Sequence, residues 1–210
     1  MINHLHKQWI SLTSNFTEDN ALIETYWLEL KKHYTLPSRH YHNFSHISQM
    51  LAQAETIKHA LENLNAFKFA IWYHDIIYKA TKKNNEEKSA NFAKKRLKSF
   101  DFDDIFIKNV EKLIISTKKH EVLNLANLDN AYLLDIDLSI LGSDWEVYKV
   151  YIKNIRKEYK IYPSFVYNPG RKKVLQHFLE RETLYFTELF KTQYESQARK
   201  NLKREIELLN

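Results

Sequence analysis

The segment Asn65-Ala-Phe-Lys-Phe-Ala-Ile-Trp-Tyr-His-Asp-Ile-Ile77 is the most apolar stretch of the chain. Its apolar residues occupy most of the circumference of a helix rather than one stripe, a pattern typical of a helix surrounded by others. We therefore predict a helix that begins near Asn65, runs through Ile77 and lies at the centre of a helical bundle.

An adjacent pair, His74-Asp75, lies inside this apolar segment. An ionised aspartate buried without a partner costs several kcal/mol, so the pair needs a compensating group. A bound divalent cation would take the carboxylate charge and the imidazole lone pair at once. The structural alternative is pairing with neighbouring backbone groups or with an arginine, and the dipeptide alone does not decide between the two.

Apolar residues recur at helical spacing along most of the chain. One earlier helix is predicted to bury Ile23, Tyr26, Trp27, Leu30 and Tyr34. After a loop at 35–44, Ser45 is the expected N-cap of a helix that buries Ile47, Met50, Leu51, Ala54 and Ile57. Asn84 and Glu87 have the spacing of a capping box for the helix after the 79–85 loop. Further helices are expected near 103–118, 129–141, 144–160, 170–191 and 193–209, with Pro163 and Asn168-Pro169-Gly170 marking breaks.

Only two glycines, Gly142 and Gly170, and three prolines occur among the 210 residues. All-β folds and doubly wound α/β folds need glycine at many turns, and phosphate-binding loops need it in clusters. Long helices joined by short polar loops are the architecture that remains. Because the chain has no internal repeat and no linker, we expect one helical domain over 1–210, with the motifs at about 35–142 and a C-terminal helical part at about 143–210.

The remaining composition restricts the surroundings and partners of the chain. The absence of cysteine excludes disulfides and thiolate zinc sites. We find no secretion signal and no run of eighteen apolar residues, so we expect a cytoplasmic protein without a membrane span.

The formal charge of +6 comes from scattered lysines, which is typical of a solvated surface and would also attract anionic substrates. No basic stretch resembles a nucleic-acid-binding element, so nucleic acid is not an expected partner. The oligomeric state stays open, a homodimer included.

Two other segments concentrate histidine and aspartate. Arg39-His-Tyr-His-Asn-Phe-Ser-His46 precedes the helix that follows the 35–44 loop, and His46 stands 28 residues before His74. That spacing corresponds to one helix and its return, so two antiparallel neighbours can bring both imidazoles together. Leu133-Leu-Asp-Ile-Asp-Leu-Ser-Ile-Leu141 carries Asp135 and Asp137 in another apolar helix. These two lie roughly 200° apart around a helix, so only one of them can face a single metal ion.

His46, then His74-Asp75, then an aspartate on a later helix resemble the H…HD…D signature of the HD superfamily of metal-dependent phosphohydrolases. The similarity runs from about residue 20 to the C-terminus. More narrowly, the segments similar to the predicted HD phosphohydrolase family of bacteria are Arg39-His-Tyr-His with His46-Ile47, Trp72-Tyr-His-Asp75, Asn85-Glu86 with Ser89-Ala90, Asp135-Ile-Asp-Leu-Ser-Ile-Leu-Gly142, Ile155-Arg156 with Glu158-Tyr159, and Gly170-Arg171.

The resemblance implies an HD-domain-like helical bundle with additional C-terminal helices. It also implies that the metal ligands are His46, His74, Asp75 and Asp137. The context Ile136-Asp137-Leu138 matches the final aspartate of the family better than Asp135 does, which leaves Asp135 as a helix-surface residue or one that supports a ligand. His42 is the rival of His46 as the early ligand and would otherwise contact substrate.

The resemblance suggests roles for other residues. It brings Glu86 over the site as a general acid or base, although a glutamate is also favoured at any helix N-terminus. His120 lies where two-metal members place additional histidines; because it stands alone there, one metal ion is expected, and His120 would contact phosphate or end a helix. Arg39, Arg156 and Arg171 are candidate phosphate clamps, or else surface ion-pair residues.

Two histidines and two carboxylates suit one divalent ion of Mn, Fe, Co, Ni, Zn or Mg. We expect such an ion to activate water for the hydrolysis of a phosphate ester, with a small phosphorylated substrate such as a nucleotide. Dioxygen activation would require two irons and therefore additional ligands. The alternative from another class is a metal- or nucleotide-binding regulatory protein without turnover.

Overall fold

The computed structural model describes residues 1–123 and 128–209, and every regular element in these ranges is a helix. The all-α fold class is therefore confirmed for the described residues, where no helix is long and apolar enough to cross a membrane. Two short 3-10 helices are η1 (Lys58–Ala60) and η2 (Ser139–Gly142). The α-helices are α1 (Ile2–Thr13), α2 (Asn20–Tyr34), α3 (Phe44–Thr56), α4 (Leu64–Tyr73), α5 (Asn85–Lys98), α6 (Asp104–Ser116), α7 (Asp129–Leu138), α8 (Trp145–Glu158), α9 (Ser164–Glu180) and α10 (Glu188–Leu208).

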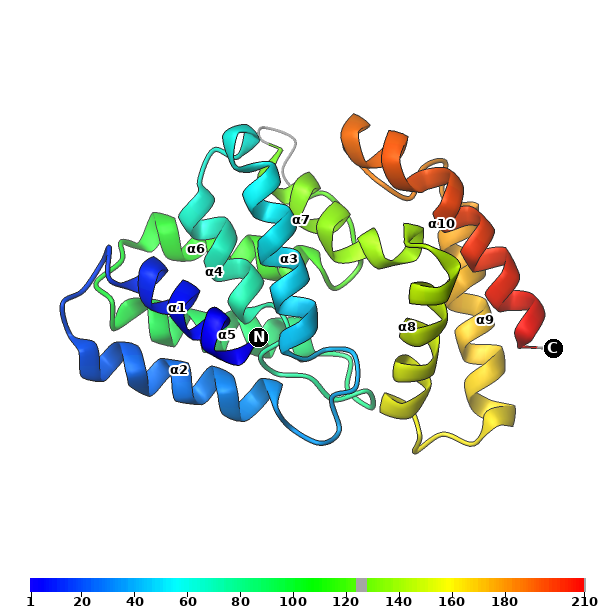
Figure 1. Cartoon of the computed structure of the whole chain (residues 1–210), viewed down its shortest axis with the longest axis horizontal. Coiled ribbons are helices and arrows are strands. Elements are labelled where there is room, and N and C mark those ends of the chain that lie inside the picture. Colours follow the sequence, from blue (N-terminus) through cyan, green and yellow to red (C-terminus); the bar gives the residue numbers. More distant parts are fainter. Residues whose placement is uncertain (124–127, 210) are drawn as a thin grey trace.

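The helices form two groups, as Figure 1 shows. Helices α1 to α7 gather in the first group, and α8, α9 and α10 lie side by side in the second. The element η2 leads from the first group to the second and packs against α10. Helix α4 contacts α3, α5, α6 and α7, so it is the centre of the first group.

Helix α4 is buried almost all round, as its composition predicted. From Ala66 to Tyr73, every residue except Lys68 is at most 1 % exposed. The ring of Trp9 on α1 meets the ring of Trp72 edge to face at 5.7 Å. Burial of this apolar surface is the main favourable contribution to the stability of the group, and it fixes the position of the residues that follow α4.

The end of α4 differs from the prediction. The helix stops at Tyr73 rather than continuing to Ile77, so the His-Asp pair lies in the turn that follows the helix and not inside it. The guanidinium group of Arg39 donates to the carbonyl oxygens of Asp75 at 2.6 Å and of Ile76 at 2.8 Å. In a longer helix these carbonyl groups would accept from N–H groups further along the chain. A tertiary contact thus replaces the helical hydrogen bonds.

The inner faces of α2 and α3 are confirmed, because all residues predicted to lie on them are buried. The N-cap of α3 is Asn43 rather than Ser45: the Asn43 side chain accepts the N–H group of Ser45 at 2.8 Å. Asn84 does precede α5, but its side chain makes no capping hydrogen bond within the described part of the chain. Glu87 pairs with Lys118 instead, so the predicted capping box is wrong.

The predicted helices at 170–191 and 193–209 have the wrong bounds. Pro169 lies in the second turn of α9, where it removes a single helical hydrogen bond near an exposed helix start. Arg199 donates to the carbonyl oxygen of Leu179 at the end of α9 and to those of Arg181 and Glu182 in the connection to α10. Glu195 accepts the backbone N–H groups of Leu184 and Tyr185 in the same connection. These tertiary hydrogen bonds stabilise a connection where periodicity predicted a continuing helix.

A buried carboxylate ties α10 to α7. Asp135 is fully buried and accepts the N–H groups of Phe186 at 2.7 Å and Thr187 at 2.8 Å, together with the Thr187 hydroxyl at 2.6 Å. Thr187 is the N-cap of α10, so these bonds satisfy donors at the start of that helix. Burial raises the pKa of Asp135 to about 6, against the effect of these hydrogen bonds. Asp135 therefore joins two helices and is neither a surface residue nor a substrate contact.

Replacing Asp135 with alanine is expected to lower the free energy of unfolding by about 2 to 4 kcal/mol, because buried donors lose their charged acceptor. Urea unfolding followed by circular dichroism measures this change. The exposed Asp104 provides the matched control, Asp104→Ala, with an expected change below about 0.5 kcal/mol. Equal stability of the two variants would contradict the proposed link between α7 and α10.

Candidate metal centre

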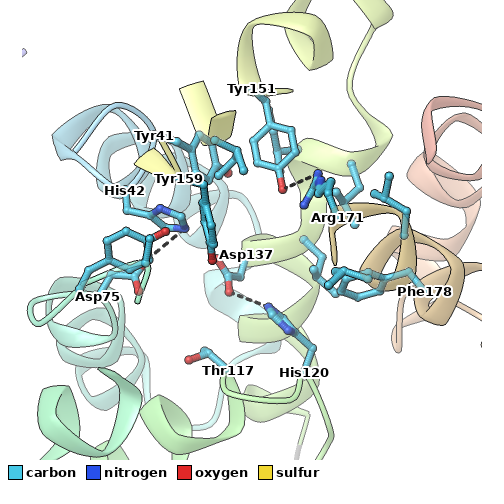
Figure 2. A pocket seen from close by; sticks show the side chains of 18 of the residues that line it. Tyr41, His42, Asp75, Thr117, His120, Asp137, Tyr151, Tyr159, Arg171 and Phe178 are labelled. Atoms are coloured by element: carbon cyan, nitrogen blue, oxygen red, sulfur yellow. Dashed lines mark hydrogen bonds and ion pairs between the residues drawn. The ribbon is translucent and has the colours of Figure 1, made fainter. Parts of the chain in front are cut away.

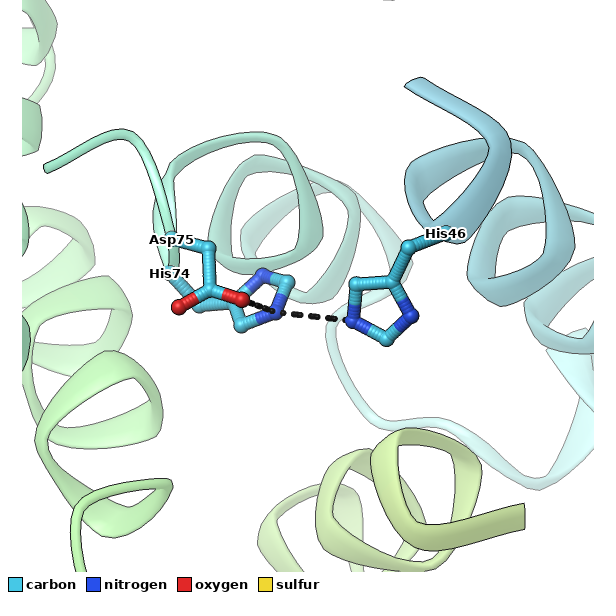
Figure 3. A group of neighbouring side chains, drawn as sticks. All are labelled: His46, His74 and Asp75. Atoms are coloured by element: carbon cyan, nitrogen blue, oxygen red, sulfur yellow. Dashed lines mark hydrogen bonds and ion pairs between the residues drawn. The ribbon is translucent and has the colours of Figure 1, made fainter. Parts of the chain in front are cut away.

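Three side chains from α3 and from the turn after α4 converge in one group (Figure 3). His46 lies in the first turn of α3, and His74 and Asp75 directly follow α4. The Nε2 atoms of the two histidines are 3.3 Å apart, and Asp75 Oδ2 lies 3.2 Å from His74 Nε2. These ligand atoms are close enough to one another to hold a metal ion. One helix and its return bring the two imidazoles together, as the spacing predicted.

Asp137 on α7 offers a fourth ligand atom. Its Oδ1 lies 3.2 Å from His46 Nε2 and 3.9 Å from His74 Nε2. Neighbouring ligands bound at roughly 2.1 Å from one ion are roughly 3.0 to 3.4 Å apart. The separations of 3.2 and 3.3 Å in this group suit a shared ion, and the separation of 3.9 Å between Asp137 and His74 is longer. Asp135, two positions earlier, faces α10. The geometry therefore favours Asp137 over Asp135, the choice that the sequence context also favoured.

A backbone hydrogen bond orients the ring of His74. Its Nδ1 lies 2.9 Å from the carbonyl oxygen of Ile71. Because a carbonyl oxygen can only accept, Nδ1 carries a proton and donates it. In the neutral ring the lone pair is then on Nε2, the atom that faces His46 and Asp75. Histidines that bind metal ions are usually oriented by such a bond from the other nitrogen.

Opposite charges compensate one another in this group. Burial alone would lower the pKa of His74, but attraction to the Asp75 carboxylate raises that pKa to about 9. Burial would raise the pKa of Asp75, whereas the imidazoles of His74 and His42 hold it below its ordinary value. The pKa of Asp137 is also held low against the effect of burial, by a hydrogen bond from His120. Two ionised carboxylates that are only 13 % and 14 % exposed thus demand positive charge, which a divalent cation can supply.

A cavity of about 540 Å³ lies beside the group, between the two sets of helices (Figure 2). His42, His74, Asp75 and Asp137 line one end of it. The opposite wall comes from α8, α9 and the segment that joins them. A ligand in this cavity would therefore touch the candidate metal ligands on one side and the C-terminal helices on the other.

Glu158, at the end of α8, has a role at the site that the sequence did not predict. Its Oε1 accepts the N–H groups of His40, Tyr41 and His42 at 2.7 to 3.0 Å, and its Oε2 lies 2.6 Å from His42 Nδ1. The carboxylate accepts, so Nδ1 donates, and His42 Nε2 lies 4.0 Å from Asp75 Oδ2 (Figure 2). The one signal in the sequence was that Glu158 falls inside a segment similar to the family, which says nothing about its partner.

His120 and Glu86 both line the cavity, as expected for residues near the site. His120 Nε2 lies 3.3 Å from Oδ2 of Asp137, the carboxylate oxygen other than the one near His46. The backbone of His120 has a φ of 49°, and Arg181 donates to its carbonyl oxygen at 3.1 Å. Glu86 lies in the first turn of α5, and burial raises the pKa of its carboxyl group.

The three candidate arginines have different surroundings. Arg39 donates to backbone carbonyl groups around the turn that carries Asp75, so it supports a ligand rather than presenting its charge to a phosphate. Arg156 donates to carbonyl groups of the α8–α9 connection and is not brought to the cavity. Arg171 does line the cavity, but two of its nitrogens bond to both carboxylate oxygens of Glu205.

Comparison of the chain with protein-family models, with curated proteins and with solved structures finds no match. The function is therefore inferred from the positions of the side chains just described and from the sequence pattern that they complete.

Mn²⁺ added to chelator-treated protein is expected to bind at one ion per chain and to raise the melting temperature, because a ligand of the folded state stabilises it. Loss of a residue that only supports a ligand costs about 10- to 100-fold in affinity, so His74→Ala should cost more than about 100-fold. Isothermal titration calorimetry measures both proteins. His177→Ala, at an exposed histidine of α9, is the control. Undiminished binding by His74→Ala would remove His74 from the ligand set.

Proposed function

We propose that this chain is a metal-dependent phosphohydrolase of the HD superfamily that hydrolyses a phosphate ester. The observation that carries the proposal is the convergence of His46, His74, Asp75 and Asp137 beside a cavity of about 540 Å³, which the last three of them line. Three separate segments supply these side chains, and together they complete the H…HD…D pattern of the sequence. The adjacent cavity has the size of a small-molecule site.

The donor atoms fit a divalent metal ion. Two imidazole nitrogens and two carboxylate oxygens, without sulfur, suit Mn²⁺, Fe²⁺, Co²⁺, Ni²⁺, Zn²⁺ or Mg²⁺. Such an ion, when bound, lowers the pKa of a water ligand and polarises a phosphoryl oxygen, the two effects that hydrolysis of a phosphate ester requires. The hydrogen bonds from Arg39 to the turn after α4 hold the backbone of Asp75 in place for this role.

In this proposal His42 transfers a proton. Because Glu158 accepts the Nδ1–H group, the other ring nitrogen faces the cavity beside Asp75. Nε2 of His42 can accept a proton from water or return one to the leaving oxygen. Glu86 is the second candidate for this step, since burial raises the pKa of its carboxyl group and a raised pKa suits a general acid.

The decisive experiment measures phosphate release from a panel of nucleotides and simple phosphate esters in the presence of Mn²⁺. Wild-type protein is expected to release phosphate, and Asp75→Ala is expected to be inactive because it lacks one candidate ligand. Release by the wild type alone supports the proposal. Equal release by both proteins, or none from any ester and with any of the six metals, would refute it.

Glu158→Gln tests the role of the His42 ring. A glutamine amide nitrogen donates where the carboxylate oxygen accepts, so the proton of neutral His42 should move from Nδ1 to Nε2. We expect kcat/KM to fall about 10- to 100-fold while Mn²⁺ still binds. Steady-state kinetics and the ¹⁵N shifts of His42 measure the two effects. Glu146→Gln, at an exposed glutamate of the same helix, is the control, and an unchanged tautomer with full activity would contradict this role.

A further inference from the structure

The part of the cavity wall that the C-terminal helices supply is aromatic. Among its residues are five aromatic side chains from α8, α9 and the segment between them, called here the aromatic wall: Tyr151, Tyr159, Tyr162, Tyr167 and Phe178. Figure 2 shows Tyr151 and Phe178 across the space from His42 and Asp75, while Tyr159 lies beside His42. Aliphatic side chains fill the gaps in this wall, including Ile155, Val174 and Leu175.

We propose that the aromatic wall binds the base of a nucleoside monophosphate whose single phosphate lies at the candidate metal ligands. This inference rests on the proposed phosphohydrolase function and names its substrate class. Three observations support it: the aromatic surface, an unpaired buried hydroxyl group, and the pairing of the cations at the cavity.

The aromatic wall suits a planar group. Aromatic side chains stack with nucleobases, whichever base is offered, because every base has a π-face. The rings are held by contacts with one another: the ring of Tyr159 lies 5.9 Å from that of Tyr167 and 6.3 Å from that of Tyr162. The guanidinium group of Arg181 lies over the Phe178 ring at 4.8 Å. A planar base would therefore bind against rings whose positions are already fixed by contacts with other side chains.

The hydroxyl group of Tyr167 favours a nucleobase over a purely apolar ring as the ligand. Its side chain lines the cavity and is 8 % exposed, and its hydroxyl group has no hydrogen-bond partner among the described residues. Buried hydroxyl groups are nearly always paired, since an unpaired one loses its hydration without compensation. The polar edge of a nucleobase offers donors and acceptors to such a group, whereas an aliphatic or phenyl substituent offers none.

The charges at the cavity favour one phosphate. Lys118 pairs with Glu87, and Arg171 pairs with Glu205 at 2.7 and 3.0 Å. These are the lysine and the arginine of the described cavity lining, so both cations are already neutralised by carboxylates. Glu86 adds a further carboxylate to the lining. A second or third phosphate away from the metal ligands would lack a counter-charge, which disfavours nucleoside diphosphates and triphosphates.

The test compares adenosine 5′-monophosphate with ribose 5-phosphate, which has the same phosphate ester and no base, and with adenosine triphosphate. For Mn²⁺-loaded wild type we expect kcat/KM for the monophosphate to exceed each of the other two by about 10-fold or more. Calorimetric titration with the same three compounds measures affinity directly, so the comparison does not depend on turnover.

Two variants probe the aromatic wall. Tyr167→Phe removes only the hydroxyl group and should lower the preference for the monophosphate over ribose 5-phosphate about 5-fold. Phe178→Leu removes an aromatic surface and should lower it about 10-fold. Phe165→Leu is the matched control, because Phe165 lies on the same helix, is 80 % exposed and is not part of the cavity lining; the preference should be unchanged.

The outcomes separate the two proposals. Equal affinity and equal kcat/KM for the monophosphate and ribose 5-phosphate would overturn the base site, while phosphate release from both would leave the hydrolase function standing. A preference for the triphosphate would overturn the inference of a single phosphate. Tight, base-dependent binding without phosphate release from any ester would refute hydrolysis and support the base site.

Discussion

The structure depends on the position of two largely, though not fully, buried carboxylates, Asp75 and Asp137, next to the imidazoles of His46 and His74. A carboxylate in this position needs a compensating charge to stay ionised, and His74, whose pKa is raised, lies 3.2 Å from Asp75. Burial lowers the pKa of His46, which lies 3.2 Å from Asp137, so this imidazole leaves positive charge to be supplied by a cation. The four side chains come from α3, from the turn that follows α4, and from α7. These three segments must therefore pack against one another in a single way for the side chains to meet. The buried helix α4 positions the turn that follows it. The hydrogen bond from Arg39 to the carbonyl oxygen of Asp75 keeps that turn from continuing as a helix. Site and core are therefore formed by the same packing.

The C-terminal helices contribute to the site as well as to the fold. Glu158 joins the end of α8 to three successive backbone N–H groups before α3, and the same carboxylate orients the His42 ring. Asp135 joins α7 to the start of α10, and Asn201 on α10 donates to the carbonyl oxygens that flank Gly142. The cavity lies between the two groups of helices, so its shape depends on these hydrogen bonds.

Helix faces could be predicted from the sequence, and helix ends could not. The face that α2 buries follows from a 3.6-residue period, which is local and survives in any packing. The end of α4 at Tyr73 depends on the hydrogen bonds from Arg39 to the turn that follows it. The end of α9 at Glu180 depends in the same way on the hydrogen bonds from Arg199 to the α9–α10 connection. Such contacts join residues that are distant in the sequence and leave no periodic signal.

By itself, the sequence determined the helical class of the protein, the central place of α4 and the need of the His74-Asp75 pair for a compensating group. Scarce glycine, helical periodicity and the cost of buried charge are properties of the chain that hold before any packing is known. Only the tertiary structure decided that Asp137 and not Asp135 faces the histidines, that Glu158 orients His42 across 116 residues, and that Arg156 lies away from the cavity. The physical reason is that a hydrogen bond or ion pair requires contact within a few ångströms, and contact between distant segments is set by how the helices pack.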